Sequence, residues 1–113
     1  MHELGITQNI VAIATDHAQG AQIRRITLEI GQLTAIMADS IRFCFDVCAQ
    51  GTPLEGATLE IIECPGLGQC RDCGNQLELD QPYGVCDCGS IQIDIIQGEE
   101  LTIKELETEA LCA

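Results

Sequence analysis

The stretch that decides the fold is residues 64–89, which read CPGLGQCRDCGNQLELDQPYGVCDCG. It holds two short cysteine pairs, Cys70-Arg71-Asp72-Cys73-Gly74 and Cys86-Asp87-Cys88-Gly89. Two cysteines that bracket a tight turn point both sulfurs at one site, and the glycine that follows lets backbone amides turn toward them. Two such turns predict a tetrahedral four-sulfur site, a geometry that a structural zinc ion accepts readily. The predicted zinc ligands are Cys70, Cys73, Cys86 and Cys88.

Several features of this segment keep alternatives open. The second pair has one intervening residue instead of two, and Cys64 is a fifth thiol that can replace either of its members. The same knuckles also suit a rubredoxin-like iron centre for electron transfer, but such centres keep aromatic residues around the iron, and here only Tyr83 is near. Buried or disulfide-bonded cysteines are the least favoured interpretation for a cytosolic chain. Colour separates the two metals, because the iron protein is red and the zinc protein is colourless.

The rest of the chain predicts an α+β fold. Helical spacing of apolar residues predicts a helix over 4–19, and alternation predicts a half-buried strand over 22–31. A second helix is expected over 40–50, and a second strand over 57–63. Residues 91–106 alternate around a Gln-Gly-Glu turn, which predicts a hairpin. The expected architecture is a small mixed sheet packed by two helices, with an inserted zinc-ribbon-like lobe.

The spacing also predicts which helix faces are buried. On the first helix the predicted apolar face is Ile6, Ile10, Ile13, Ala14 and His17. On the second helix it is Ile41, Cys44, Phe45 and Cys48, where the two cysteines are expected to act as small apolar residues. Asp39-Ser40 is expected to cap the start of the second helix.

Two parts of the chain are expected to form separate units. Residues 1–63 plus 91–113 are expected to form an α+β domain, and residues 64–90 an inserted zinc-binding domain. The composition changes abruptly at the insert, where five cysteines occur among few apolar residues.

Charge excludes several classes of partner. The chain has 18 acidic and 5 basic residues and a formal net charge of −13, so nucleic acid and anionic membranes repel it. Metal cations and proteins with basic patches are the partners that fit. The opening Met1-His2-Glu3-Leu4-Gly5 has an acidic residue where a secretory signal needs basic ones, and no run of about 18 apolar residues follows. We therefore expect a cytoplasmic chain.

The N-terminus offers a second metal site. The Met1 α-amine, the His2 amide nitrogen and the His2 imidazole can form fused chelate rings on one ion, with Glu3 as a further donor. Nitrogen-rich donor sets of this kind suit Ni²⁺ or Cu²⁺. An idle terminal histidine is the plainer interpretation of the same residues.

Taken in order, these motifs resemble the HypA/HybF family of hydrogenase nickel-incorporation proteins over essentially the whole chain. The matching stretches are Met1-His2-Glu3, Ile30-Gly31-Gln32-Leu33, Asp39 to Asp46, Gly56-Ala57-Thr58-Leu59, the two cysteine pairs and Gly98-Glu99-Glu100-Leu101. The resemblance implies a metallochaperone that delivers nickel to the large subunit of [NiFe]-hydrogenase together with a partner GTPase.

The resemblance also implies roles for individual residues. His2 carries over as the nickel ligand, with the Met1 amine and Glu3 beside it, and Asp39 is a further candidate oxygen ligand. The four paired cysteines carry over as zinc ligands. Homodimer formation and service to urease stay open at this point.

Two other classes of function are carried as alternatives. One is a zinc-ribbon protein-interaction module without nickel delivery, and the other is the electron-transfer protein described above. An enzyme is not expected, because the sequence has no visible nucleophile–base pair or phosphate-binding loop.

Overall fold

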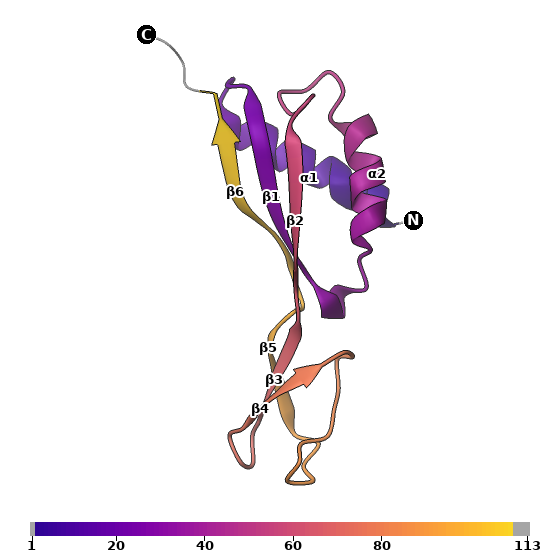
Figure 1. Ribbon diagram of the computed structural model, residues 1–113, viewed down its shortest axis with the longest axis vertical. Helices are drawn as coiled ribbons and strands as arrows, with labels where there is room; N and C mark the ends of the chain where they lie inside the picture. Colours follow the sequence, from indigo (N-terminus) through magenta and orange to yellow (C-terminus); the bar gives the residue numbers. More distant parts are fainter. Residues whose placement is uncertain (1, 110–113) are drawn as a thin grey trace.

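The computed structural model describes residues 2–109, and of His2 only the backbone. The elements in chain order are α1 (His2–Ala18), β1 (Ile23–Gly31), the 3-10 turn η1 (Gln32–Thr34), α2 (Ala38–Cys48), β2 (Thr58–Cys64), β3 (Gly66–Cys70), β4 (Gln76–Leu79), β5 (Ile93–Gln97) and β6 (Leu101–Thr108). They form an elongated molecule of 59 × 33 × 17 Å, with both helices at one end (Figure 1). Within the described chain, neither helix is long and apolar enough to cross a membrane.

The first sheet has the order β2-β1-β6 and is mixed, as predicted. The central strand β1 runs parallel to β2 and antiparallel to β6, so that Leu28 lies between Ile61 and Ile103. A parallel pair needs a crossover, and α2 lies in the crossover that joins β1 to β2. The predicted fold class, two helices against a small mixed sheet with an extra lobe, is confirmed.

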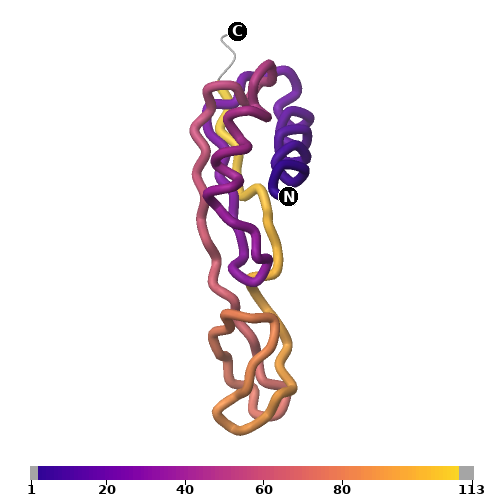
Figure 2. Tube along the Cα trace, turned by 90° about the vertical axis from the view of Figure 1, so that its right-hand side faces the viewer, coloured from indigo at the N-terminus to yellow at the C-terminus, as the bar shows by residue number. Residues whose placement is uncertain are grey.

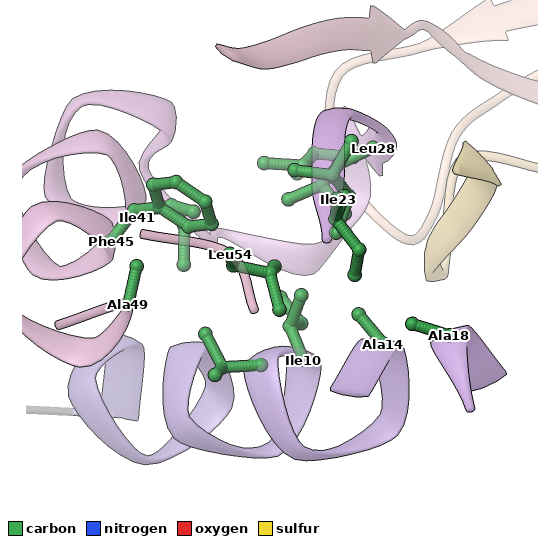
Figure 3. Close-up of a cluster of buried hydrophobic side chains, with 12 residues drawn as sticks. Ile10, Ala14, Ala18, Ile23, Leu28, Ile41, Phe45, Ala49 and Leu54 are labelled. Atoms are coloured by element: carbon green, nitrogen blue, oxygen red, sulfur yellow. The ribbon is translucent and has the colours of Figure 1, made fainter. Parts of the chain in front are cut away.

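The core lies between this sheet and the two helices. Side chains of α1, α2 and β1 point toward one another there, together with Leu54 from the loop after α2 (Figure 3). The fully buried members are mostly aliphatic: Ile23, Ile26, Leu28, Ile30, Ile41 and Leu54. Burying an aliphatic side chain of this size stabilises the fold by about 1.5–3 kcal/mol, so this layer supplies most of the hydrophobic stabilisation.

The buried face of α1 differs in part from the prediction. Ile10 and Ala14 are buried as expected, but Ile13 is 50% exposed and His17 is exposed. The buried face is instead Thr7, Ile10, Val11, Ala14 and Ala18. Within residues 2–109 the sheet ends at β6 and no further strand covers the side of α1 that carries Ile13 and His17, so a shallow groove remains there.

The start of α2 also differs from the prediction. Met37 is the residue that caps the helix, without a side-chain hydrogen bond, and its carbonyl accepts from the N–H groups of Ser40 and Ile41. Asp39 therefore lies inside the first turn, where the positive end of the helix dipole stabilises its negative charge. The predicted buried face is confirmed for Ile41 and Phe45; Cys44 and Cys48 on the same face are half-buried.

The predicted hairpin over 91–106 is wrong. The strands β5 and β6 do not pair, because β5 joins β3 in a second sheet of order β4-β3-β5, while β6 joins β1 in the first. The strands β3 and β4 were not recognised in the sequence. Positions 66 and 68 of β3 are glycines, so this strand lacks the alternating side chains that mark a strand pattern.

The two sheets follow one another along the length of the molecule (Figure 2), and three glycines lie where they meet. A Cβ on Gly31 would overlap the backbone of Gly98, and a Cβ on Gly98 would lie 2.7 Å from the Cα of Gly66. The backbone of Gly98 also has φ +103°, which disfavours any other residue. Hydrogen bonds from Gly31 N to Glu100 O and from Leu33 N to Gly98 O, both 2.9 Å, close the junction. We call Gly31, Gly66 and Gly98 the glycine junction.

We predict that Gly31→Ala destabilises the protein by about 2–4 kcal/mol, since its Cβ would overlap the backbone of Gly98 and backbone cannot move aside cheaply. Gly5→Ala is the matched control, because a Cβ there meets nothing within 4 Å and the site is helical. Alanine in a helix is favoured over glycine by up to about 1 kcal/mol. Urea unfolding followed by circular dichroism measures both; equal stability of Gly31→Ala and wild type would contradict the prediction.

Candidate metal centre

Four cysteines of the second lobe meet at one point. The sulfurs of Cys70, Cys73, Cys86 and Cys88 all lie within 4.8 Å of one another. The Cys70–Cys88 sulfurs are 3.7 Å apart and the Cys73–Cys86 sulfurs 3.4 Å apart. Zinc–sulfur bonds of about 2.3 Å in a tetrahedron place sulfurs about 3.8 Å apart. The cluster therefore has the ligand type, number and spacing that a zinc ion requires.

The two knuckles use the same hydrogen bond despite their different lengths. In the first, Gly74 N donates to Cys70 O at 2.9 Å; in the second, Gly89 N donates to Cys86 O at 2.8 Å. In each case the glycine after the second cysteine bonds the carbonyl of the first, and both glycines have positive φ. The shorter pair simply closes a turn one residue tighter. The missing residue of the second pair is thus accommodated by the turn.

The strands position the knuckles from one side. Cys70 is the last residue of β3, and its N–H donates to Asn75 O, while Cys86 N donates to Ser90 O, both at 2.9 Å. Cys70 and Cys86, the first member of each pair, are buried, whereas Cys73 and Cys88 are exposed. An ion held here would be anchored on the inner side of the lobe and face solvent on the other.

The electrostatics of the cluster favour a cation. The pKa of Cys70 is lowered to about 6, chiefly because the Cys73 backbone N–H donates to its sulfur. For Cys88 the Ser90 backbone N–H acts in the same direction, but hydrogen bonds with the thiols of Cys70 and Cys86 outweigh it and raise the pKa to about 12. Thus one thiolate forms readily and opposes the formation of the next. Only a bound cation allows all four to be thiolates together.

Arg71 ties the first knuckle to the second sheet. Its guanidinium donates twice to the same carboxylate oxygen of Asp94 on β5, at 2.8 Å from Nε and 2.7 Å from Nη2. This hydrogen bonding lowers the pKa of Asp94. Both side chains are more than half exposed, so solvent screens their attraction, and the pair serves as a link between the first knuckle and β5.

Cys64 lies outside the cluster. It is the last residue of β2 in the first sheet, and its thiol contacts a Glu29 carboxylate oxygen at 3.5 Å. Burial and this hydrogen bond raise the pKa of the Cys64 thiol. Among the described residues, the group whose donor atoms converge as metal ligands is the four-cysteine cluster, without Cys64.

The predicted nickel residues are placed only in part. Met1 and the side chain of His2 lie outside the described residues. Glu3 is half-buried in the first turn of α1 and lines a cavity of about 450 Å³. Asp39, in the first turn of α2, lines the same cavity. Glu3 and Asp39, the two carboxylates predicted as possible nickel donors, therefore line the same cavity near the start of α1.

Sequence reasoning missed the apolar wall of this cavity. Phe43, Cys44 and Val47 of α2 line it with Leu4, and Phe43 and Val47 are exposed rather than packed into the core. The helical spacing does indicate this wall, because Phe43 and Val47 are apolar but lie off the buried face defined by Ile41 and Phe45.

Comparison with known proteins places the chain in context. A family model described as "Hydrogenase/urease nickel incorporation, metallochaperone, hypA" matches residues 1–108. The hydrogenase maturation factor HypA of Nostoc punctiforme is 68% identical over 112 residues, and that of Rippkaea orientalis 69% identical over 113 residues, each covering 99% of both chains. The solution structure of the Ni metallochaperone HypA from Helicobacter pylori matches with a TM-score of 0.71 and 26% identity, over 96% of this chain and 98% of that one.

We predict one zinc ion per chain, and that Cys88→Ser lowers zinc affinity at least about 100-fold because it removes one of four thiolate donors. Cys64→Ser is the matched control and retains the wild-type affinity, since its thiol lies apart from the cluster. Plasma mass spectrometry gives the stoichiometry, and chelator competition gives the affinity. Zinc loss in Cys64→Ser equal to that in Cys88→Ser would refute this ligand set.

Proposed function

We infer the function of this chain from its membership of the HypA family of hydrogenase maturation factors and nickel metallochaperones, to which it belongs. We propose that it binds Ni²⁺ at its N-terminus and passes the ion to the large subunit of a [NiFe]-hydrogenase. The single observation that carries the proposal is the family match over residues 1–108, which includes the N-terminal Met1-His2-Glu3.

The proposed nickel ligands are the His2 side chain and backbone nitrogen, with the Met1 amine and Glu3 beside them. Supporting this, α1 starts at His2, so the helix holds a terminal chelate against the domain. Asp39 lines the same cavity as Glu3, so its carboxylate is proposed as a further oxygen donor. An open site made of exchangeable donors suits delivery, because a recipient can replace the ligands one at a time.

The four cysteines are proposed to hold a structural Zn²⁺ through Cys70, Cys73, Cys86 and Cys88. The spacing of the sulfurs supports this. Zinc is favoured over a rubredoxin-like iron because Tyr83, the aromatic residue nearest in sequence to the second pair, is exposed rather than packed as a cover. When bound, the ion would supply no chemistry beyond holding the two knuckles together.

The division of labour follows the division of the chain. We propose that residues 1–63 plus 91–113 handle nickel and that the insert 64–90 holds zinc. Strand β5 lies after the insert in sequence but pairs with β3, so it forms one sheet with strands of the insert.

The proposed setting is hydrogenase maturation in the cytoplasm. The partners are a nickel-handling GTPase and the hydrogenase large subunit, both of which must carry basic surface to approach a chain of charge −13. The chain is proposed to act without catalysing a reaction, and it is proposed not to engage nucleic acid or membrane. A homodimer is compatible with this role.

We predict that His2→Ala lowers nickel affinity at least about 100-fold, and that wild-type affinity falls steeply below about pH 6.5, where the imidazole and the amine are protonated. His17→Ala is the matched control, since it removes an exposed histidine elsewhere on α1. Calorimetric nickel titration of untagged protein at pH 7.5 and pH 6.0 measures both effects. Full nickel affinity in His2→Ala would refute the site and favour a zinc-ribbon interaction module.

A further inference from the structure

The cavity between the start of α1 and the outer side of α2 has an apolar wall with no role in the core. Phe43 and Val47 lie one helical turn apart on α2 and are 77% and 60% exposed. Leu4 of α1 lines the same cavity of about 450 Å³. Ile41 and Phe45 already supply the packing of α2 against the core. The fold therefore does not use Phe43 and Val47, and exposed apolar patches of this kind mark protein interaction sites.

Acidic residues outnumber basic ones beside this apolar wall, where the exposed Arg42 precedes Phe43 on α2. Glu3 and Asp39 line the cavity, and Asp46 follows Phe43 by three residues on the same helix. Together with a chain charge of −13, these carboxylates favour a partner whose apolar contact is flanked by lysine or arginine. A second copy of this chain is disfavoured, because it would bring its own Glu3, Asp39 and Asp46 against the same three groups.

The place of the cavity indicates what the partner does. Glu3 lies next to His2 in the chain, so a protein seated on the cavity has its surface at the proposed nickel site. A recipient must approach the ion closely enough for its own ligands to replace the donors. Docking beside the cargo provides this proximity.

We propose that the cavity lined by Leu4, Phe43 and Val47 is the docking site for the protein that receives nickel, which inserts an apolar side chain flanked by basic residues. This inference rests on the proposed function, because the recipient is defined by nickel transfer. Phe43 is its central contact, since it is the largest and most exposed side chain of the wall.

The test is the affinity of the full-length chain for the purified precursor of the hydrogenase large subunit, measured by biolayer interferometry. Phe43→Ser is expected to raise Kd at least about tenfold, as truncation of a central aromatic contact does. Asp46→Lys is expected to slow association and to weaken its dependence on salt. Ile13→Ser, a half-exposed residue on the other groove of α1, is the matched control and retains wild-type affinity.

Two further measurements separate this proposal from the proposed function. Phe43→Ser keeps wild-type nickel affinity, whereas His2→Ala loses nickel but still binds the precursor. Wild-type association by Phe43→Ser overturns the docking site even if His2 binds nickel as proposed. A wild-type dimer that Phe43→Ser converts to a monomer in sedimentation also overturns it, because the second copy is then the occupant. If the wild-type protein fails to bind nickel, the proposed function is overturned instead. Association that depends on Phe43 can still be measured in nickel-free protein.

Discussion

The close approach of backbone at the glycine junction is the constraint on which the rest of the structure depends. Gly31 ends the central strand of the first sheet, and Gly98 separates the strands β5 and β6 that belong to different sheets. Two chain crossings, β2 into β3 and β5 into β6, occur there side by side, and the Gln97 side chain bonds Pro65 O at 2.9 Å across them. Without side chains at this point the sheets meet directly. The metal lobe is therefore joined through two short connections, residue 65 between β2 and β3 and residues 98–100 between β5 and β6, instead of one long linker.

The two ends of the molecule are stabilised by different forces. The helical end buries a continuous aliphatic layer, while the buried apolar residues in the other lobe are Leu79 and the two cysteines Cys70 and Cys86. A three-stranded sheet with so few buried side chains cannot form an adequate hydrophobic core, and small units of this kind need a metal or disulfide. The proposed ion on the four sulfurs would take the place of a core, which accounts for the folding of an acidic, aromatic-poor insert.

Sequence patterns predicted the fold where side chains alone determine burial. Alternation identified β1, because a central strand carries Ile26, Leu28 and Ile30 on its buried face, and the cysteine spacing identified the cluster. The patterns failed where close backbone contacts determine the structure. The glycines of β3 give no alternating pattern, so the sequence does not predict that strand. The turn at Gly98 resembles a hairpin turn, although the chain passes from one sheet to the other there. The face of α1 was partly misassigned because sequence spacing cannot reveal that the sheet stops at β6.

The separation of the two proposed metal sites has a thermodynamic reason. Divalent nickel is close to zinc in its affinity for nitrogen and sulfur donors, so a four-thiolate cage would hold the cargo as firmly as the scaffold ion. An ion held by all four sulfurs can leave only after several thiolate bonds break, and these bonds would also hold the two knuckles of the lobe together. The first turn of α1 belongs to the other end of the molecule (Figure 1). An ion held there can leave without disturbing either the aliphatic core or the cysteine cluster, so delivery and stability do not compete.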